Sequence, residues 1–336
     1  MLTFLATLKR WVLWFGVVLA LFAGSISWYT YRHVHQSIAT GPYTFHIKSG
    51  TNIRDFSTEL VKRGLSSSEW PFLVWAAYKG NTRDIKAGEY RFEQLSTLSE
   101  ILNQIVVGEV IYYPLTFIEG WTFRQILELL EKSQHLVPDL STLTSQQIMD
   151  KIGSPYTHLE GIFFPDTYFS VRGEEQSVVL RRAHEEMNAQ LAKIWDLRIP
   201  GLLLSDAYEG LILASIIEKE TARDEERAHV AGVLINRLRK NIPLQVDATV
   251  IYGLGVNFDG NLKLQHLKLD NPYNTYMRRG LTPTPISNPG LKSLLAAVNP
   301  LNTNDLYFVS RGDGSHEFSE TLKQHQRAVR TYQLNP

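Results

Sequence analysis

The feature that most constrains this chain is an uncharged stretch near its N-terminus. From Trp11 to Tyr31 there is no Asp, Glu, Lys or Arg. About 20 such residues in a helix are long enough to cross the hydrocarbon core of a bilayer. Trp and Tyr residues stand at both ends of the stretch, as in the aromatic belts of membrane proteins. The sequence therefore predicts a transmembrane helix.

The charges around this stretch predict its orientation. Lys9 and Arg10 precede it and Arg32 follows it. The positive-inside rule then places the short N-terminus in the cytoplasm and the rest of the chain outside. A cleaved signal peptide is the alternative, because small residues occur between Ala20 and Ser25, but the apolar run is longer than a usual signal core. We expect residues 1–32 to form a cytoplasmic stub and an uncleaved anchor.

The composition limits the remaining possibilities. A chain of 336 residues has room for about two domains besides the anchor. Lys plus Arg and Asp plus Glu both number 34, so the basic excess typical of nucleic-acid-binding proteins is missing. The chain has no Cys, which excludes disulfides and a thiol nucleophile.

A strand–turn–helix pattern occurs twice after a polar linker at residues 33–42. Its first copy covers residues 43–63, with a turn at Ser49–Thr51, and its second covers residues 115–130, with Gly50 and Gly120 at matching turn positions. The matches are few and mostly apolar, so a small repeated α/β module and coincidence both remain open. We place a small domain at residues 43–112, with further helices at 69–79 and 97–106.

The rest of the chain, residues 113–336, has segregated short strands and several helices, which indicates an α+β domain. The predicted elements are helices at 175–195, 205–223, 230–240, 291–298 and 320–329 and a strand at 306–309. Residues 241–289 are the least regular long stretch and are rich in Tyr, Asn, Asp, Gln and Pro. Long loops of this kind in compact domains are more often functional than idle.

One predicted helix carries a candidate catalytic group. Ala207, Leu211 and Ala214 recur on one helix face, Ser205 is a good N-cap, and Glu218 is the next residue on that face. A carboxyl group beside apolar surface is disfavoured in its charged form, which suits a general acid. The alternative is that Glu218 is solvated near a fraying helix end, with Lys219 and Glu220 as ordinary surface charges.

Other residues fit carbohydrate recognition. Amide and carboxylate groups hydrogen-bond sugar hydroxyls, and tyrosines stack on sugar rings. The candidates in residues 241–289 are Gln245, Asp247, Tyr252, Tyr273, Asn274 and Tyr276. Each Tyr has a core position as its alternative. Glu160 and Asp166 could support the site or could cap turns, and a cap is favoured for Asp166.

Several other chemistries lack their sequence motifs. The ten His are scattered without a metal-binding pattern, so we expect no metal. There is also no serine-hydrolase motif or phosphate-binding loop, and we expect no cofactor.

Several long motifs, in order, resemble the endolytic murein transglycosylase family, also called YceG-like. The resemblance covers the chain from the anchor to Val329. Its motifs are Leu213–Thr221, Val233–Leu238, Pro243–Gly253, Pro272–Tyr276, Asn288–Gly290, Gly314–Ser319 and the run from Glu160 to Tyr168. One departure is Thr282, where the family pattern has Pro, and it affects only the rigidity of a loop.

The resemblance implies a bacterial inner-membrane protein with a LysM-like domain and a catalytic domain in the periplasm. It implies cleavage of the MurNAc–GlcNAc β-1,4 bond within peptidoglycan strands, without water, leaving 1,6-anhydro-MurNAc ends. It also implies that Glu218 is the catalytic residue, and that the protein ends strand growth near peptidoglycan synthases.

This chemistry needs one carboxyl group, because the C6 hydroxyl of MurNAc is the acceptor and the same group can donate and then accept a proton. Two alternatives remain. A muramidase would use water and a second carboxylate, Asp247 or Asp270. A non-catalytic scaffold would bind peptidoglycan through the same aromatic and amide loops.

Overall fold

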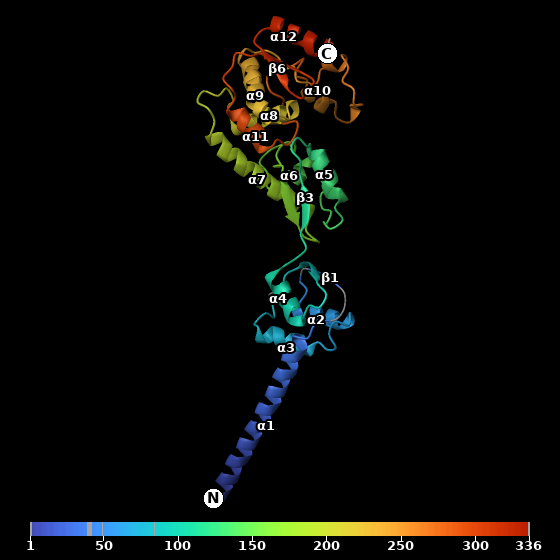
Figure 1. The fold of residues 1–336 in the computed structure, drawn as a ribbon, viewed down its shortest axis with the longest axis vertical. Coiled ribbons are helices and arrows are strands. Elements are labelled where there is room, and N and C mark those ends of the chain that lie inside the picture. The colour runs from blue at the N-terminus through green and yellow to red at the C-terminus, as the bar shows by residue number, and fades with distance from the viewer. Residues whose placement is uncertain (1, 39–41, 49, 84, 335–336) are drawn as a thin grey trace. The chain divides into compact units, whose positions relative to one another are not determined.

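The computed structural model describes residues 2–38, 42–48, 50–83 and 85–334 (Figure 1). The chain divides into two compact units, residues 1–113 with 171–173 and residues 114–170 with 174–336. Three two-stranded sheets and twelve α-helices occur within the described ranges, so the fold is α+β as expected. Residues 39–41 of the expected linker and Ser49 of the expected turn lie outside the described residues.

The first unit contains the apolar N-terminal helix and a small α/β fold. Its elements are α1 (Leu2–Val34), β1 (Tyr43–Ile47), α2 (Ile53–Lys62), α3 (Trp70–Tyr78), β2 (Gly88–Phe92) and α4 (Leu98–Val107). Strands β1 and β2 pair antiparallel, with Phe45 opposite Tyr90. Helix α4 confirms the helix expected at 97–106, and its buried residues Leu98, Ile101, Leu102 and Ile105 lie on one helix face.

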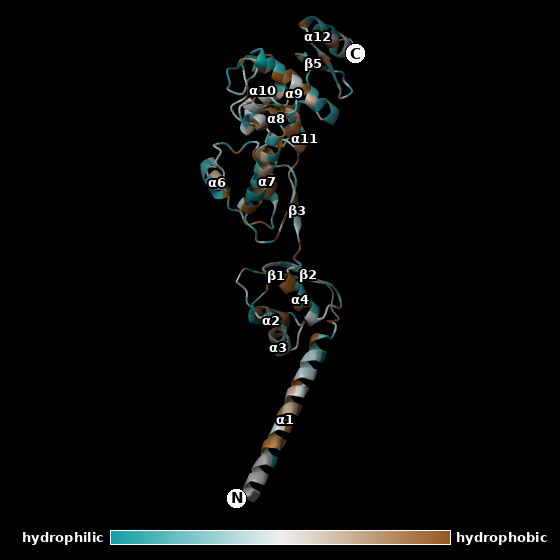
Figure 2. Ribbon diagram, turned by 90° about the vertical axis from the view of Figure 1, so that its left-hand side faces the viewer, coloured by the Kyte–Doolittle hydropathy of each residue, from teal (hydrophilic) through white to brown (hydrophobic). Residues whose placement is uncertain are grey.

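Helix α1 contains one segment that is long and apolar enough to cross a membrane. The segment is Arg10–Val34, with a mean hydropathy of 1.8 and no residue of its most apolar window buried inside the protein. Figure 2 shows apolar colours along the middle of this helix. The finding fits either a membrane anchor or a signal sequence.

The second unit contains the remaining elements. They are β3 (Tyr113–Thr116, whose first residue belongs to the first unit), α5 (Phe123–Lys132), α6 (Ser145–Ile152), β4 (Thr167–Ser170), α7 (Gln176–Asp196), α8 (Ala207–Glu220), α9 (Asp224–Arg239), α10 (Asp247–Leu254), η1 (Gly255–Asn257), η2 (His266–Lys268), α11 (Leu291–Val298), β5 (Tyr307–Ser310), β6 (His316–Ser319), α12 (Leu322–Val329) and η3 (Arg330–Leu334). Strand β3 pairs with β4, and β5 pairs antiparallel with β6.

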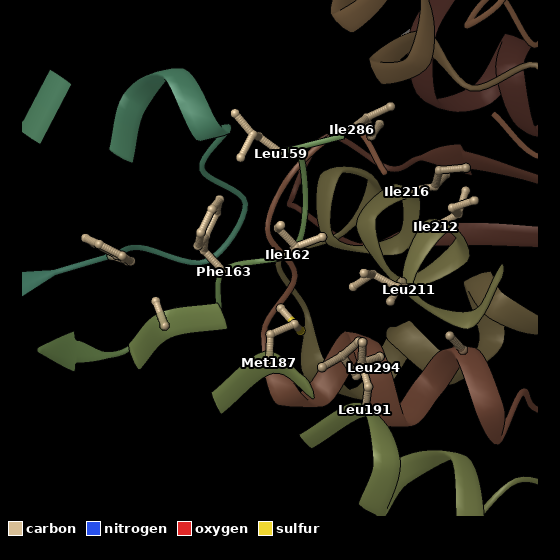
Figure 3. Close-up of a cluster of buried hydrophobic side chains, with 14 of the residues drawn as sticks. Leu159, Ile162, Phe163, Met187, Leu191, Leu211, Ile212, Ile216, Ile286 and Leu294 are labelled. Carbon is tan, nitrogen blue, oxygen red and sulfur yellow. The ribbon is translucent and has the colours of Figure 1, made fainter. Parts of the chain in front are cut away.

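The core of the second unit is built around α8. Helices α7, α9 and α11 all contact it. Figure 3 shows Leu211 of α8 on the side toward Leu191 of α7 and Leu294 of α11, whereas Ile212 and Ile216 project from another side of α8. Every residue from Gly210 to Ile217 is buried, so α8 is apolar on all sides rather than amphipathic as its sequence suggested.

Three details of the sequence prediction change. Asp206, not Ser205, is the N-cap of α8, and its side chain accepts a hydrogen bond from the Glu209 N–H at 2.8 Å. Helix α9 begins at Asp224, six residues before the predicted start, because acidic residues in its first turn are favoured by the helix dipole although they show no apolar period. The irregular stretch 241–289 contains α10.

Candidate active site

The last turn of α8 presents two carboxyl groups to different surroundings. Glu218 and Glu220 are two residues apart, and successive helical residues are rotated by about 100°, so their side chains leave the helix on nearly opposite sides. Their neighbours therefore decide which one can meet a substrate.

Glu218 is held in a nearly closed polar cluster. Its side chain is only 6% exposed and forms an ion pair of 3.2 Å with Arg227, which is equally buried. Its other carboxylate oxygen accepts a hydrogen bond of 3.0 Å from the N–H of Gly290, the N-cap of α11. The guanidinium and the helix N-terminus both stabilise a negative charge. The sequence placed Glu218 on an apolar stripe, and the structure instead places its carboxylate among these polar partners.

A second carboxylate approaches the same cluster. A Cβ built on Gly290 would collide with the Glu119 carboxyl group, so the missing side chain of Gly290 leaves room for this carboxylate. Partial burial raises the pKa of Glu119, and the nearby charge of Glu218 raises it further. Arg227 also donates a hydrogen bond of 2.6 Å to Ser293, which fixes the guanidinium between α9 and α11. These contacts link the loop before α5 to α8, α9 and α11.

Glu220 lines a cavity instead. The cavity has a volume of about 500 Å³ and its polar lining residues include Gln245, Asp247, Tyr276 and His316. No hydrogen bond or ion pair to the Glu220 side chain occurs in the described part of the chain. Burial raises the pKa of Glu220 to about 7, and the charge of Asp247 contributes to this rise. A carboxyl group with this pKa can both donate and accept a proton near neutral pH.

Three of the predicted sugar-binding residues meet in this cavity. Gln245, Asp247 and Tyr276 all line it, and the Tyr276 hydroxyl donates a hydrogen bond of 2.5 Å to Asp247. Gln245 has a positive φ of 55° and its side-chain oxygen accepts a hydrogen bond from Arg237 at 3.1 Å. The loop before α10 is thereby fixed with its polar side chains at the cavity wall.

Three other candidates form a separate cluster. The carboxyl group of Glu160 accepts hydrogen bonds from the Phe123 N–H at 2.9 Å and the Tyr252 hydroxyl at 3.2 Å. Tyr252 packs edge-on against Tyr273, whose hydroxyl is 2.9 Å from that of Thr284. Burial raises the pKa of Glu160 to about 7, although both hydrogen bonds lower it. This cluster caps α5 and packs the loop 271–284 against α10.

The remaining two candidates have structural contacts. Asn274 is fully buried, and its amide donates to the carbonyl groups of His266, Leu267 and Leu269. Asp166 is exposed and its side chain accepts a hydrogen bond from the Thr167 N–H at 2.6 Å. This contact matches the turn-capping alternative.

The sequence reasoning missed Glu220 and the contribution of the C-terminal strands. His316 begins β6, lines the cavity and pairs with Glu226 of α9 at 2.6 Å. His325 of α12 lines the same cavity. Burial lowers the pKa of His325 and so favours its neutral form. The sequence signal that could have identified Glu220 was its position on the helix face opposite Glu218.

Across the described ranges, no group of three or more His, Cys, Asp or Glu side chains is arranged to hold a metal ion.

Comparison with known proteins identifies one family. The chain belongs to the YceG-like family, whose model matches residues 45–331. This confirms the resemblance seen in the sequence.

Named proteins and a solved structure are similar to this chain over most of its length. A protein of Bacillus subtilis (strain 168) named endolytic murein transglycosylase is 30% identical, over 85% of this chain and 84% of the relative. A protein of the same name from Streptococcus pneumoniae (strain ATCC BAA-255 / R6) is 28% identical over 96% of this chain, which spans 65% of that relative. The crystal structure of a yceG-like protein from Listeria monocytogenes matches with a TM-score of 0.55 and 28% identity, over 85% of this chain and 98% of that one.

Proposed function

We propose that this protein is an endolytic peptidoglycan lytic transglycosylase that cleaves the MurNAc–GlcNAc β-1,4 bond within glycan strands. The names of its relatives support the substrate and the reaction. The observation that carries the proposal is the desolvated carboxyl group of Glu220 at a cavity lined with amide, carboxylate and tyrosine groups. These are the groups that bind and cleave a glycan.

In the proposed reaction, a single carboxyl group at the end of α8 acts twice. In its protonated form it gives its proton to the glycosidic oxygen, and the bond from that oxygen to C1 of MurNAc breaks. The C6 hydroxyl of the same MurNAc then attacks C1, and the carboxylate takes the hydroxyl proton. The products are a GlcNAc 4-hydroxyl and a 1,6-anhydro-MurNAc end, and the carboxyl group regains its proton.

Glu220 fits this role better than Glu218. Glu220 reaches the cavity and burial favours its protonated form, whereas Glu218 is held by Arg227 and the Gly290 N–H outside the lining of that cavity. The assignment of catalysis to Glu218 stays a prediction. In this scheme the carboxylate of Asp247, which accepts a hydrogen bond from the Tyr276 hydroxyl, stabilises the positive charge that develops on the sugar ring.

We further propose a single-pass bacterial inner-membrane protein with a cytoplasmic N-terminus and a periplasmic catalytic domain at residues 113–336. The segment Arg10–Val34 supports this placement by its length and composition. Residues 43–112 would be a LysM-like domain. An anchored enzyme acts where new strands emerge, so peptidoglycan synthases are the proposed protein partners.

Hydrolysis is the second candidate, because Asp247 lines the same cavity and offers a second carboxylate. Asp270, the other predicted partner, is exposed and paired with Arg278 at 2.8 Å. The test is to incubate the full chain with intact peptidoglycan and to identify the released ends by mass spectrometry. Anhydro-MurNAc ends support the lytic reaction, and reducing MurNAc ends support hydrolysis. Binding without any cleavage would favour the scaffold.

A further inference from the structure

Helix α3 exposes an apolar face. Its nine residues contain no charged side chain. Phe72 and Ala76 are fully buried in the first unit, whereas Trp70, Val74 and Tyr78 are 71%, 37% and 77% exposed. These three residues recur every four positions and so form one stripe along the helix. Large apolar side chains that gather on one exposed face usually mark a contact surface.

This face is continuous with the apolar helix α1. Trp70, Pro71 and Val74 form one wall of a groove of about 460 Å³, and residues Phe22, Ser25, Ile26, Tyr29 and Thr30 of α1 form the other. Buried Thr30 and Val34 fix the end of α1 against the unit. The ring of Trp75 also packs edge-on against His35, with 5.1 Å between ring centres. The groove is therefore set by packing within one compact unit.

The position of the groove along α1 determines its depth in a bilayer. The segment Arg10–Val34 has 25 residues, and at 1.5 Å per residue it is about 37 Å long, against about 30 Å for a hydrocarbon core. Phe22 is at the midpoint of the segment and Thr30 is near its C-terminal end. The residues of α3 that line the groove therefore lie in the same half of the bilayer as these residues of α1.

We propose that α3 enters the membrane with its Trp70–Val74–Tyr78 face, in the half of the bilayer at the C-terminal end of α1. The proposal rests on α1 spanning a membrane. Trp and Tyr suit this depth because their rings are apolar with one polar atom. Arg32 follows the groove residues of α1 and lies over the ring of Trp28, and Lys79 follows α3 and lies over the ring of Trp75. Basic side chains at these two positions suit an anionic membrane surface. The carboxylate of Glu69, just before α3, instead accepts a hydrogen bond from Thr58 at 2.8 Å.

The absence of Cys from the chain makes the test direct, because one introduced cysteine gives one label. Val74→Cys is labelled with a nitroxide in the full chain, reconstituted in vesicles of phosphatidylethanolamine and phosphatidylglycerol. Collisions with oxygen report lipid exposure, and collisions with a water-soluble nickel chelate report water exposure. Gly16→Cys in the middle of α1 and Asp55→Cys on the exposed side of α2 are the matched controls.

The proposal expects a ratio of oxygen to nickel accessibility at position 74 that is several-fold above the Asp55 control and close to the Gly16 control. Tyr78→Cys, on the same stripe, is expected to give the same result. Water-like values at both 74 and 78, with a lipid-like value at 16, would overturn this proposal alone. A water-like value at 16 would overturn the anchor as well. Shielding of position 74 from both reagents would mean that protein covers the face, and would also overturn the proposal.

Discussion

The hydroxyl of Tyr276 donates a hydrogen bond of 2.5 Å to the carboxylate of Asp247, at the wall of the cavity that Glu220 lines. Burial raises the pKa of Tyr276, and so does its bond to Asp247, which keeps the hydroxyl a donor at neutral pH. Burial is the larger cause of the raised pKa of Glu220, and the charge of Asp247 adds to it. The hydrogen bond from Tyr276 therefore holds in place the carboxylate that contributes to this pKa.

Removing this hydrogen bond tests the role of Asp247. Tyr276→Phe leaves the ring in place and deprives Asp247 of its donor. Hydrogen bonds to charged groups contribute about 1.5–3 kcal/mol, so we expect kcat/KM to fall by at least about tenfold. The measurement is the rate of release of anhydro-MurNAc ends. The matched control is Tyr273→Phe, which loses a bond to Thr284 away from the cavity. Equal losses in both variants would contradict the assignment.

Substitutions of the two glutamates in the last turn of α8 are predicted to have different effects. Glu220→Gln removes the proposed acid, so cleavage is expected to fall by about 10²-fold or more while the fold is kept. Glu218→Gln leaves Arg227 buried without its carboxylate, so we expect a loss of about 3 kcal/mol in stability with cleavage retained. Thermal unfolding and product release are measured on both variants. A Glu218→Gln protein with unchanged stability and no activity would return catalysis to Glu218.

The sequence predicted the elements whose information is local. The apolar faces of α4 and α7 follow the helical period, and Gly50 and Gly120 both adopt the positive φ of the predicted turns. The helical period of the sequence did not predict which face of α8 lines a cavity. That cavity is completed by β6 and α12, which lie about 100 residues later in the chain. Similarly, the Glu160–Tyr252 hydrogen bond joins residues 92 positions apart. Contacts of this kind depend on tertiary packing and leave no periodic pattern in the sequence.

The pKa of about 7 predicts how cleavage depends on pH. The reaction begins with protonated Glu220, so kcat/KM, which reports the free enzyme, is expected to fall as pH rises through about 7. The measurement is kcat/KM from pH 5 to pH 9 with intact peptidoglycan. The catalytic assignment would fail if kcat/KM stayed constant from pH 6 to pH 8.5.

The raised pKa of Glu220 also predicts that the stability of the protein depends on pH. The pKa of Glu220 is raised in the folded state, so the folded protein binds more protons than the unfolded chain between about pH 4.5 and pH 7, and stability falls as pH rises through this window. Glu220→Gln removes the free-energy cost of ionising this buried carboxyl group in the folded state. We expect the variant to gain about 2 kcal/mol over the parent at pH 8.5, after allowance for partial solvent access, and to gain nothing at pH 4. A gain that is the same at both pH values would contradict the raised pKa.

Replacement of Gly161, the glycine beside Glu160, is predicted to cost stability through both backbone conformation and lack of space. Gly161 has a φ of 81°, and a Cβ there would lie 2.3 Å from the Cβ of Pro285. Gly153, at the end of α6, has a similar φ of 73° but open space around its missing Cβ. Gly153→Ala therefore isolates the conformational cost, about 1 kcal/mol, whereas Gly161→Ala adds a steric clash of about 1–3 kcal/mol. Urea unfolding of both variants measures the difference, and equal losses would mean that the loop of Pro285 yields without cost.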